Sequence, residues 1–185
     1  MISQFEDVSA GGFYYTSSDH ENLITRAKDR QDNATPSGNA MAAYSLLRLA
    51  RLCARPELEE KAVGTLDVLS GLMAKHALAS SQSLLAAEFL AGPGWELVLV
   101  DGNSAAANAE ARQLINESFI PGRLIIPSLK AGTGSPVAAP VADRPAVDGE
   151  PTLYLCRRGA CQNPVHGVDA IRSTISDLAD GAADL

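Results

Sequence analysis

The residues best suited to chemistry are concentrated in one polar stretch near the N-terminus, residues 26–39. Charged and amide side chains alternate there with turn formers, and Pro36 fits the first position of a helix that the stretch opens. The unpaired N–H groups of a helix N-terminus favour an oxyanion or a carboxylate. Asp and Asn residues before a helix also commonly cap it and pair locally. Two interpretations are therefore open, a ligand-facing loop and a helix start that satisfies its own backbone.

Asp19 and His20 form a second candidate, a general acid/base pair. A carboxylate can orient an imidazole, which titrates near neutral pH. The two residues lie in a polar segment, residues 17–21, and a surface loop explains them equally well. Hydrolysis of a glycosidic bond would need two carboxylates about 5–10 Å apart. Asp19, Asp29 and Asp32 are candidates for such a pair, and their separation depends on the fold.

Cys156 and Cys161 are the third candidate, separated by the residues Arg-Arg-Gly-Ala. Neighbouring arginines lower the pKa of a thiol and favour the reactive thiolate. However, two thiols supply only half of a zinc site, and the spacer is longer than the two residues of redox dithiols. A thiol pair in a strand–turn corner, a redox pair and a metal role therefore all stay open. The odd count of three cysteines argues against a disulfide framework and favours a reducing compartment.

Composition and charge exclude several classes of protein. Hydrophobic residues make up 46% of the 185 and charged residues 20%, which is typical of a globular chain with a buried core. The formal net charge of −7, without a cluster of Lys or Arg, argues against nucleic acid and anionic membranes as partners. The sequence has no apolar run of about 18 residues and no signal-peptide pattern at its start. We expect a cytoplasmic protein that uses no metal or other cofactor.

The elements that must position these residues fall into two parts, residues 1–92 and 93–185. The first part begins with aromatic and β-branched runs on both sides of the polar loop, a pattern that predicts a β-hairpin or a pair of irregular strands. Thr35 is predicted to cap the first helix, ahead of Pro36. Apolar side chains at helical spacing then predict three helices joined by short turns, over about residues 36–55, 56–76 and 81–91.

The second part has the pattern of a small α/β appendage. A buried strand, a helix and a second strand predict a β-α-β unit with parallel strands. A Pro- and Gly-rich loop at residues 131–151 separates this unit from a third strand and a last helix. The fold class is therefore α+β. The predicted strands cover residues 95–100, 124–126 and 152–156, and the predicted helices cover residues 105–117 and 168–179.

Two groups of motifs resemble one protein family. The first group reads GGFYYT at residues 11–16, DHE at 19–21, RAKD at 26–29 and DNATPSGN at 32–39, and the second reads LCRRGACQNPV at 155–165. Both resemble the C-terminal end of thioredoxin-domain-containing proteins of the YyaL and spermatogenesis-associated type. Ala27 and Arg30 depart from this pattern, because prolines are expected at both positions.

The resemblance implies an architecture for the whole chain. Residues 1–92, with the hairpin and three helices, would be the C-terminal fragment of an (α/α)6 toroid similar to six-hairpin glycosidases and N-acylglucosamine 2-epimerases. Residues 93–185 would be the three-stranded α/β appendage. An incomplete ring exposes an apolar flank, so we expect self-association or docking to the missing part of the toroid.

The resemblance also implies a function. The full-length protein would be carbohydrate-active, with isomerase or epimerase character, and would bind a sugar-type small molecule at one mouth of the toroid. The alternative is a non-catalytic interaction or redox-adaptor module that uses Cys156 and Cys161. The residues expected to contact the ligand are Arg26, Lys28, Asn33, Ser37 and Asn39, and the candidates for catalysis are Asp19, His20 and Asp32.

Overall fold

The chain reaches its first long helix through a segment with little regular structure. The computed structural model describes residues 1–21, 24–92, 94–127 and 144–183. Within the described part of residues 1–37, regular structure is limited to helix α1 (Ile2–Phe5) and one β-bridge between Glu6 and Phe13. The predicted β-hairpin is therefore wrong for the described residues. Leu23, which belonged to its second run, lies outside them.

Backbone hydrogen bonds explain why the aromatic run forms no hairpin. The N–H of Phe13 donates to Oδ1 of Asn39 at 2.6 Å, and Nδ2 of Asn39 donates to the Phe13 carbonyl at 2.9 Å. The N–H of Tyr14 donates to the carbonyl of Phe5 at 2.8 Å. These backbone groups are satisfied by a side chain and by the end of α1, so they do not pair with a second strand.

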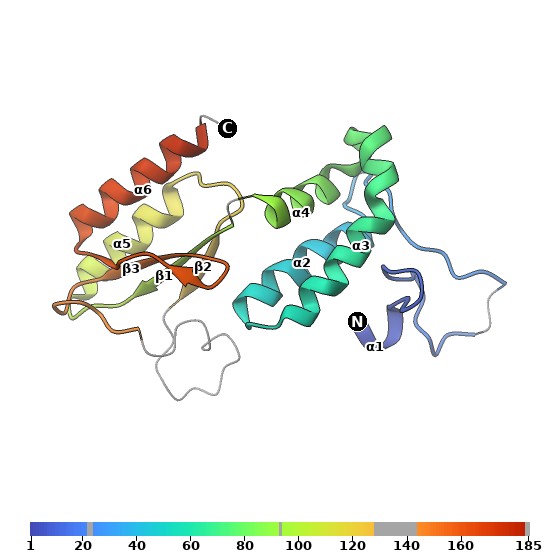
Figure 1. The fold of residues 1–185 in the computed structure, drawn as a ribbon, viewed down its shortest axis with the longest axis horizontal. Helices are drawn as coiled ribbons and strands as arrows, with labels where there is room; N and C mark the ends of the chain where they lie inside the picture. Colours follow the sequence, from blue (N-terminus) through green and yellow to red (C-terminus); the bar gives the residue numbers. More distant parts are fainter. Residues whose placement is uncertain (22–23, 93, 128–143, 184–185) are drawn as a thin grey trace. The chain divides into compact units, whose positions relative to one another are not determined.

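The helices of the first part form as the apolar spacing predicts (Figure 1). Ser37 Oγ accepts a hydrogen bond from the N–H of Ala40 at 3.2 Å, so Ser37 caps the first long helix. The predicted cap at Thr35 is wrong, and Pro36 precedes the helix instead of opening it. The elements are α2 (Gly38–Leu52), α3 (Pro56–Lys75), the 3₁₀ turn η1 (Ala77–Ser80) and α4 (Ser81–Ala91).

One apolar core joins these helices. It combines Phe13 with side chains of α2, α3 and α4, and Leu47 and Ala62 are fully buried within it. The Phe89 ring of α4 meets Tyr44 edge-on, with ring centroids 5.7 Å apart. The guanidinium of Arg51 lies 4.4 Å from the Phe89 ring centroid and donates to the Phe89 carbonyl at 3.0 Å. A cation at the end of α2 therefore joins that helix to α4.

The second part of the chain forms a mixed sheet with two helices. The chain divides into two compact units, residues 1–51 with 55–92 and residues 52–54 with 93–185. The described strands of the second unit follow the order β2-β1-β3-β4, and β5 also pairs with β3. The elements are β1 (Trp95–Val100), α5 (Ala105–Glu117), β2 (Leu124–Pro127), β3 (Thr152–Arg157), β4 (Ala160–Cys161), β5 (Val165–His166) and α6 (Val168–Ala183).

The predicted β-α-β unit is confirmed, because β1 and β2 are parallel and α5 connects them. Strand β3 is antiparallel to β1. The three predicted strands are present, and the short strands β4 and β5 extend the sheet beyond them. Most of the predicted Pro- and Gly-rich loop lies in residues 128–143, outside the described residues.

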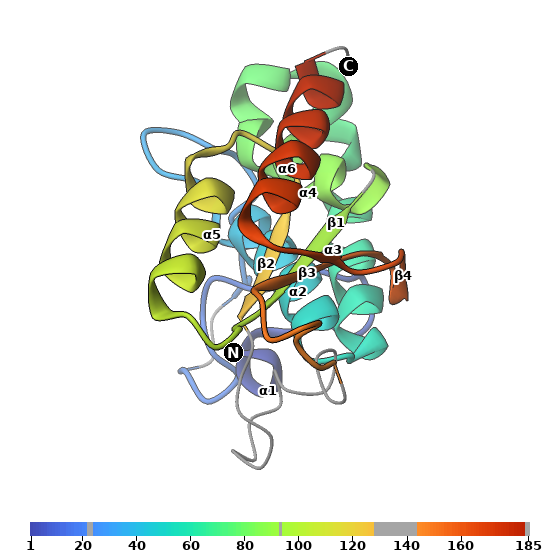
Figure 2. The same ribbon diagram turned by 90° about the vertical axis from the view of Figure 1, so that its left-hand side faces the viewer.

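Helices α5 and α6 cover the same face of the sheet (Figure 2). Alternate residues of a strand point to opposite faces, so Leu97 of β1 and Leu155 of β3 share this face. Ile115 of α5 and Ile171 of α6 belong to the same buried cluster. Glu96 and its cross-strand neighbour Cys156 therefore lie on the other face of the sheet.

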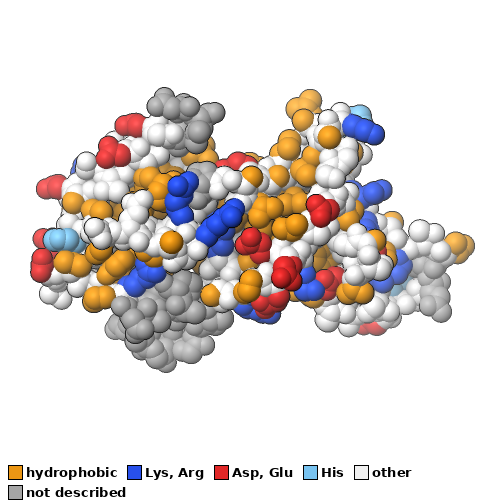
Figure 3. All heavy atoms as spheres, in the orientation of Figure 1, with side chains coloured by type: hydrophobic (Ala, Val, Ile, Leu, Met, Phe, Trp, Pro, Cys, Tyr) orange, Lys and Arg blue, Asp and Glu red, His pale blue; other side chains and the backbone are white. Residues whose placement is uncertain are grey.

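The surface mixes charged and apolar side chains, and on the face in Figure 3 acidic and basic groups are interspersed. The helices of the first unit also carry apolar side chains outside their core. The larger exposed ones are Met41, Leu49, Val63, Leu84 and Leu85. None of the described helices has the length and apolar character needed to cross a membrane.

The contact between Asn39 and Phe13 leads to a prediction about stability. Asn39→Ala removes a buried amide and leaves the backbone groups of Phe13 without partners, each at a cost of about 1–3 kcal/mol. We expect the free energy of unfolding to fall by roughly 2–4 kcal/mol in urea denaturation. Asn33→Ala, the same change at an exposed position, should cost under about 0.5 kcal/mol. Equal losses in the two variants would contradict this account of the segment.

Candidate functional site

Asp7 lies at the centre of a polar network, although it is not among the candidates that the sequence indicates. Its Oδ2 lies 2.8 Å from Nζ of Lys28 and accepts a hydrogen bond from the Tyr14 hydroxyl at 2.7 Å. Its Oδ1 accepts from the hydroxyl and the N–H of Ser9 (2.7 and 3.0 Å) and from the N–H of Ala10 (3.1 Å). The one signal in the sequence is local, an Asp followed by small, turn-forming residues.

These donors hold the pKa of Asp7 well below that of an ordinary aspartate. The hydrogen bond from Lys28 is the largest cause, and the groups of Ser9, Tyr14 and Ala10 also favour the charged carboxylate. The pKa of Tyr14 is raised, mainly because its hydroxyl donates to that carboxylate. At physiological pH Asp7 is therefore ionised and Tyr14 is neutral.

Lys28 and Arg26, two predicted ligand-binding residues, both support this network. Besides its ion pair with Asp7, Lys28 donates to the carbonyl of Gly11 at 2.5 Å. Arg26 donates to the carbonyl of Thr16 at 2.5 Å, and its guanidinium lies 4.0 Å from the centroid of the Tyr14 ring. Both cations thus hold the N-terminal segment against the loop that precedes α2.

Asp32, Ser37 and Asn39 are buried and satisfy backbone groups. Asp32 accepts from the N–H of Ser37 at 2.7 Å and, through its second oxygen, from the N–H of Gln82 in α4 at 2.8 Å. One carboxylate therefore serves the first turns of two helices. Asn39 also donates to the carbonyl of Asp29 at 2.6 Å. Contact of these side chains with a ligand stays a prediction.

An open hollow of about 620 Å³ lies between this loop and the C-terminal end of α3. Of the predicted ligand-binding residues, Lys28 and Asn33 line it. Asp29, a candidate for the pair of carboxylates, also lines it. Apolar side chains of α3 complete the wall. The remaining lining residues are Arg30, Gln31, Val68, Gly71, Leu72, Lys75 and His76.

The two residues of the predicted acid/base pair have different neighbours. Asp19 accepts a hydrogen bond from the hydroxyl of Ser17 at 2.5 Å. Nδ1 of His20 lies 3.4 Å from the carbonyl oxygen of Glu21. Both side chains are exposed, and neither lines the hollow described above. Their catalytic role stays a prediction.

Cys156 and Cys161 occupy directly opposite positions in a tight hairpin of β3 and β4. The two residues of the turn, Arg158 and Gly159, have φ values of 49° and 81°, as a two-residue hairpin turn of type I′ requires. A disulfide bond joins the two cysteines. The odd count of cysteines argues against a disulfide framework, and the structure corrects this for Cys156 and Cys161, while Cys53 is a free thiol. The four-residue spacer does not reveal this bond, because the sulfur atoms meet through the cross-strand register of β3 and β4.

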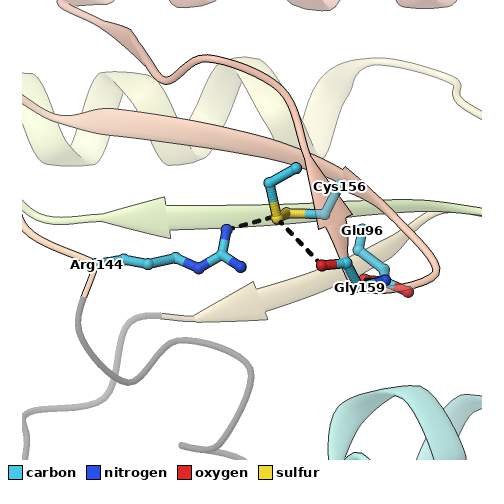
Figure 4. The surroundings of a disulfide bond; sticks show 5 residues. Glu96, Arg144, Cys156 and Gly159 are labelled. Atoms are coloured by element: carbon cyan, nitrogen blue, oxygen red, sulfur yellow. Dashed lines mark hydrogen bonds between the residues drawn. A yellow bond between two sulfur atoms is a disulfide. The ribbon is translucent and has the colours of Figure 1, made fainter.

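The two cysteines differ in exposure, and Figure 4 shows Arg144 and Gly159 beside their disulfide. Cys156 is buried, with 2% of its surface exposed, whereas Cys161 is exposed. Nη1 of Arg144 lies 3.1 Å from Sγ of Cys156. The arginines between the cysteines were expected to act on the thiols, but the guanidinium of Arg157 lies 4.7 Å from the ring centroid of Trp95. Arg144 was missed because it is distant in sequence.

Glu96 is the acidic group on the same side of the hairpin. It is buried and pairs across the strands with Cys156. Its Oε2 accepts a long hydrogen bond, 3.4 Å, from the N–H of Gly159, and Figure 4 shows the carboxylate beside the turn. Among the described residues, no three His, Cys, Asp or Glu side chains are grouped as a metal ion would require.

Comparison with known proteins identifies distant relatives over most of the chain. The chain is 25% identical to spermatogenesis-associated protein 20 of Homo sapiens over 167 residues and of Rattus norvegicus over 168, in both cases 87% of this chain. It is 22% identical to an uncharacterized protein of Caenorhabditis elegans over 163 residues, or 88% of this chain. The chain spans about a fifth of the length of these relatives, 21–22%. No family model and no solved structure matches it.

The depressed pKa of Asp7 leads to a prediction about pH. The folded protein keeps this carboxylate ionised at a pH at which the unfolded chain, with an aspartate pKa of about 4, already binds a proton. The stabilisation is thus present above about pH 4 and is lost as the pH falls below it. We expect Asp7→Asn to lower the melting temperature at pH 7. Between pH 6 and pH 3, the melting temperature of this variant should fall by less than that of the unmodified chain.

Thermal melts of both proteins across this pH range check the prediction. Asp148→Asn, at an exposed aspartate of the second unit, is the matched control and should follow the unmodified chain. A decrease of the same size in the Asp7→Asn protein and in the unmodified chain would contradict a stabilising role for the ionised Asp7.

Proposed function

We propose that this chain supplies one wall of a small-molecule site in a longer protein, and that the ligand is a sugar-type compound with an acidic group. In this proposal α2, α3 and α4 belong to an (α/α)6 toroid of the six-hairpin type, linked to a thioredoxin-like domain. The complete protein is carbohydrate-active, with isomerase or epimerase character. The distant similarity to much longer relatives supports the idea that this chain acts together with further segments.

The observation that carries this proposal is the composition of the hollow beside α3. Side-chain donors and acceptors line it, among them Gln31 and Asn33, which suit the hydroxyl groups of a sugar. Val68 and Leu72 provide apolar wall beside them. A polyhydroxylated ring needs both kinds of contact.

The charge of the hollow selects the class of sugar. Lys28, Arg30 and Lys75 line it, and Asp29 is the carboxylate among its lining residues. Asp29 accepts from the N–H of Gly38 and Lys28 pairs with Asp7, so both charges also serve the fold. Arg30 and Lys75 are exposed and are placed to meet a phosphate or carboxylate. A phosphorylated sugar or a sugar acid fits this balance better than a neutral sugar.

Ligand-dependent melting of the purified chain tests the proposal. A hexose phosphate or a hexuronate should raise the melting temperature, by mass action, more than the neutral hexose at the same concentration. Lys75→Ala removes a charge-assisted contact worth about 1.5–3 kcal/mol, so affinity should fall roughly 10- to 100-fold. Arg172→Ala, which removes an exposed cation of α6, should leave affinity unchanged.

The hollow is the wrong site if no acidic sugar changes the melting temperature, or if Arg172→Ala and Lys75→Ala weaken binding equally. The same samples test docking to further segments. The exposed apolar side chains of α2, α3 and α4 are proposed to meet those segments, and in the isolated chain they should drive self-association. A monodisperse monomer in sedimentation velocity would contradict this part of the proposal.

We propose as a second function that the hairpin of β3 and β4 is a dithiol/disulfide module. The disulfide between Cys156 and Cys161, at an exposed turn, favours it. Titration of the unfolded chain should find one thiol, Cys53, without reductant and three thiols after reduction. Three thiols in the untreated chain, purified in air, would remove the basis of this function.

A further inference from the structure

Building on the second proposed function, we infer that an incoming thiolate attacks the disulfide at Sγ of Cys161. Cys156 is then the leaving group, and Arg144 stabilises its thiolate. The two cysteines, an equivalent pair in the sequence, then have separate roles in the exchange. Three features of the hairpin distinguish them, namely the exposure of each cysteine, the position of one guanidinium and the line along which a thiolate must approach.

Access decides which sulfur is attacked. In thiol–disulfide exchange the incoming thiolate approaches along the S–S axis, on the side of the attacked sulfur that faces away from its partner. An approach to Cys161 comes from the solvent side, because Cys161 and the turn residues before it are exposed. An approach to Cys156 would cross the buried side of the sheet, where Cys156 clusters with Val98 and Ile126. Cys161 is therefore the sulfur within reach.

Charge decides which sulfur leaves. Arg144 places Nη1 3.1 Å from Sγ of Cys156, so the thiolate that forms there meets a hydrogen-bond donor and a positive charge at once (Figure 4). The Arg144 guanidinium also lies 5.2 Å from the centroid of the Tyr154 ring, which helps to hold it in place. Glu96 opposes a thiolate by its charge, but its carboxylate bonds to the Gly159 N–H at the turn. Arg144 is in direct contact with the sulfur and supplies a positive charge there.

Reduction of the disulfide takes two exchange steps. A thiolate of the reductant attacks Sγ of Cys161 and forms a mixed disulfide, the bond between Cys161 and Cys156 breaks, and its electron pair stays on Sγ of Cys156. A second thiolate of the reductant then attacks the reductant's sulfur atom in the mixed disulfide, and Cys161 is released as a thiolate. The reductant leaves as a disulfide after giving two electrons, and Cys156 and Cys161 take up protons from water as their pKa values require. The partner class is therefore a dithiol, or two molecules of a monothiol.

The position of the mixed disulfide tests the order of attack directly. The oxidised chain is treated briefly with glutathione, quenched at neutral pH with excess N-ethylmaleimide, and digested with trypsin, which cleaves after Arg157 and Arg158 and so separates the two cysteines. Mass spectrometry should find glutathione on Cys161 and maleimide on Cys156. Glutathione mainly on Cys156 would overturn the order. This measurement uses the unmodified chain and does not depend on a variant that folds.

Reduction kinetics test the role of Arg144. A cation in contact lowers a thiol pKa by about 1–3 units, and exchange rates follow the pKa of the leaving thiol, so Arg144→Gln should slow reduction by dithiothreitol about three- to thirtyfold. Arg144→Lys should restore most of the rate because it keeps the charge, and Arg172→Gln should match the unmodified chain. The pH at which Cys156 reacts with iodoacetamide, measured in a Cys161→Ser protein, should rise on Arg144→Gln.

The outcomes separate this inference from the function on which it rests. A chain that contains no disulfide after purification in air refutes the dithiol/disulfide function itself. A disulfide that forms and is reduced at the same rate in the Arg144→Gln, Arg144→Lys and unmodified proteins preserves that function and refutes the role of Arg144.

Discussion

A chain segment without regular secondary structure must find partners for its backbone polar groups, and this constraint organises the N-terminal unit. The segment before α2 contains one short helix and an isolated bridge among its described residues. Side chains therefore take the place of strand pairing. Asn39 binds both backbone groups of Phe13, and Asp32 accepts from N–H groups at the starts of α2 and α4. Asn39 thereby helps to fix the aromatic run on α2, and Asp32 joins the starts of two helices.

The same constraint explains why a dense polar stretch is not by itself a binding site. Asp32, Ser37 and Asn39 are buried and bond to the backbone, so their polar atoms already have partners. Five other polar side chains of the stretch, at residues 28–31 and 33, line the hollow beside α3. Half of that lining comes from α3 and the residue that follows it, a stretch that reads in sequence as an ordinary amphipathic helix. The chemistry proposed for this unit therefore depends on how the loop and α3 meet.

In the second unit, a tight turn brings Cys161 to Cys156, and a cation from elsewhere in the sequence, Arg144, contacts the sulfur of Cys156. The left-handed conformations of Arg158 and Gly159 reverse the chain within two residues and place Cys161 opposite Cys156. The sheet buries Cys156, while the turn leaves Cys161 exposed. Arg144 reaches the buried sulfur from a segment that precedes β3. This asymmetry is the physical basis for assigning different roles to the two cysteines.

The sequence by itself determined most of the regular elements. Apolar periodicity, Pro56 and the glycines after α4 act over a few residues, so the positions of α3, α4 and β1 could be predicted closely. Only the tertiary structure decided the partners of the polar side chains. Asp7 meets Lys28, Phe13 meets Asn39 and Arg144 meets Cys156 because folding joins residues that no local pattern connects. The missing hairpin has the same origin, since the long-range hydrogen bonds between Phe13 and Asn39 replace strand pairing.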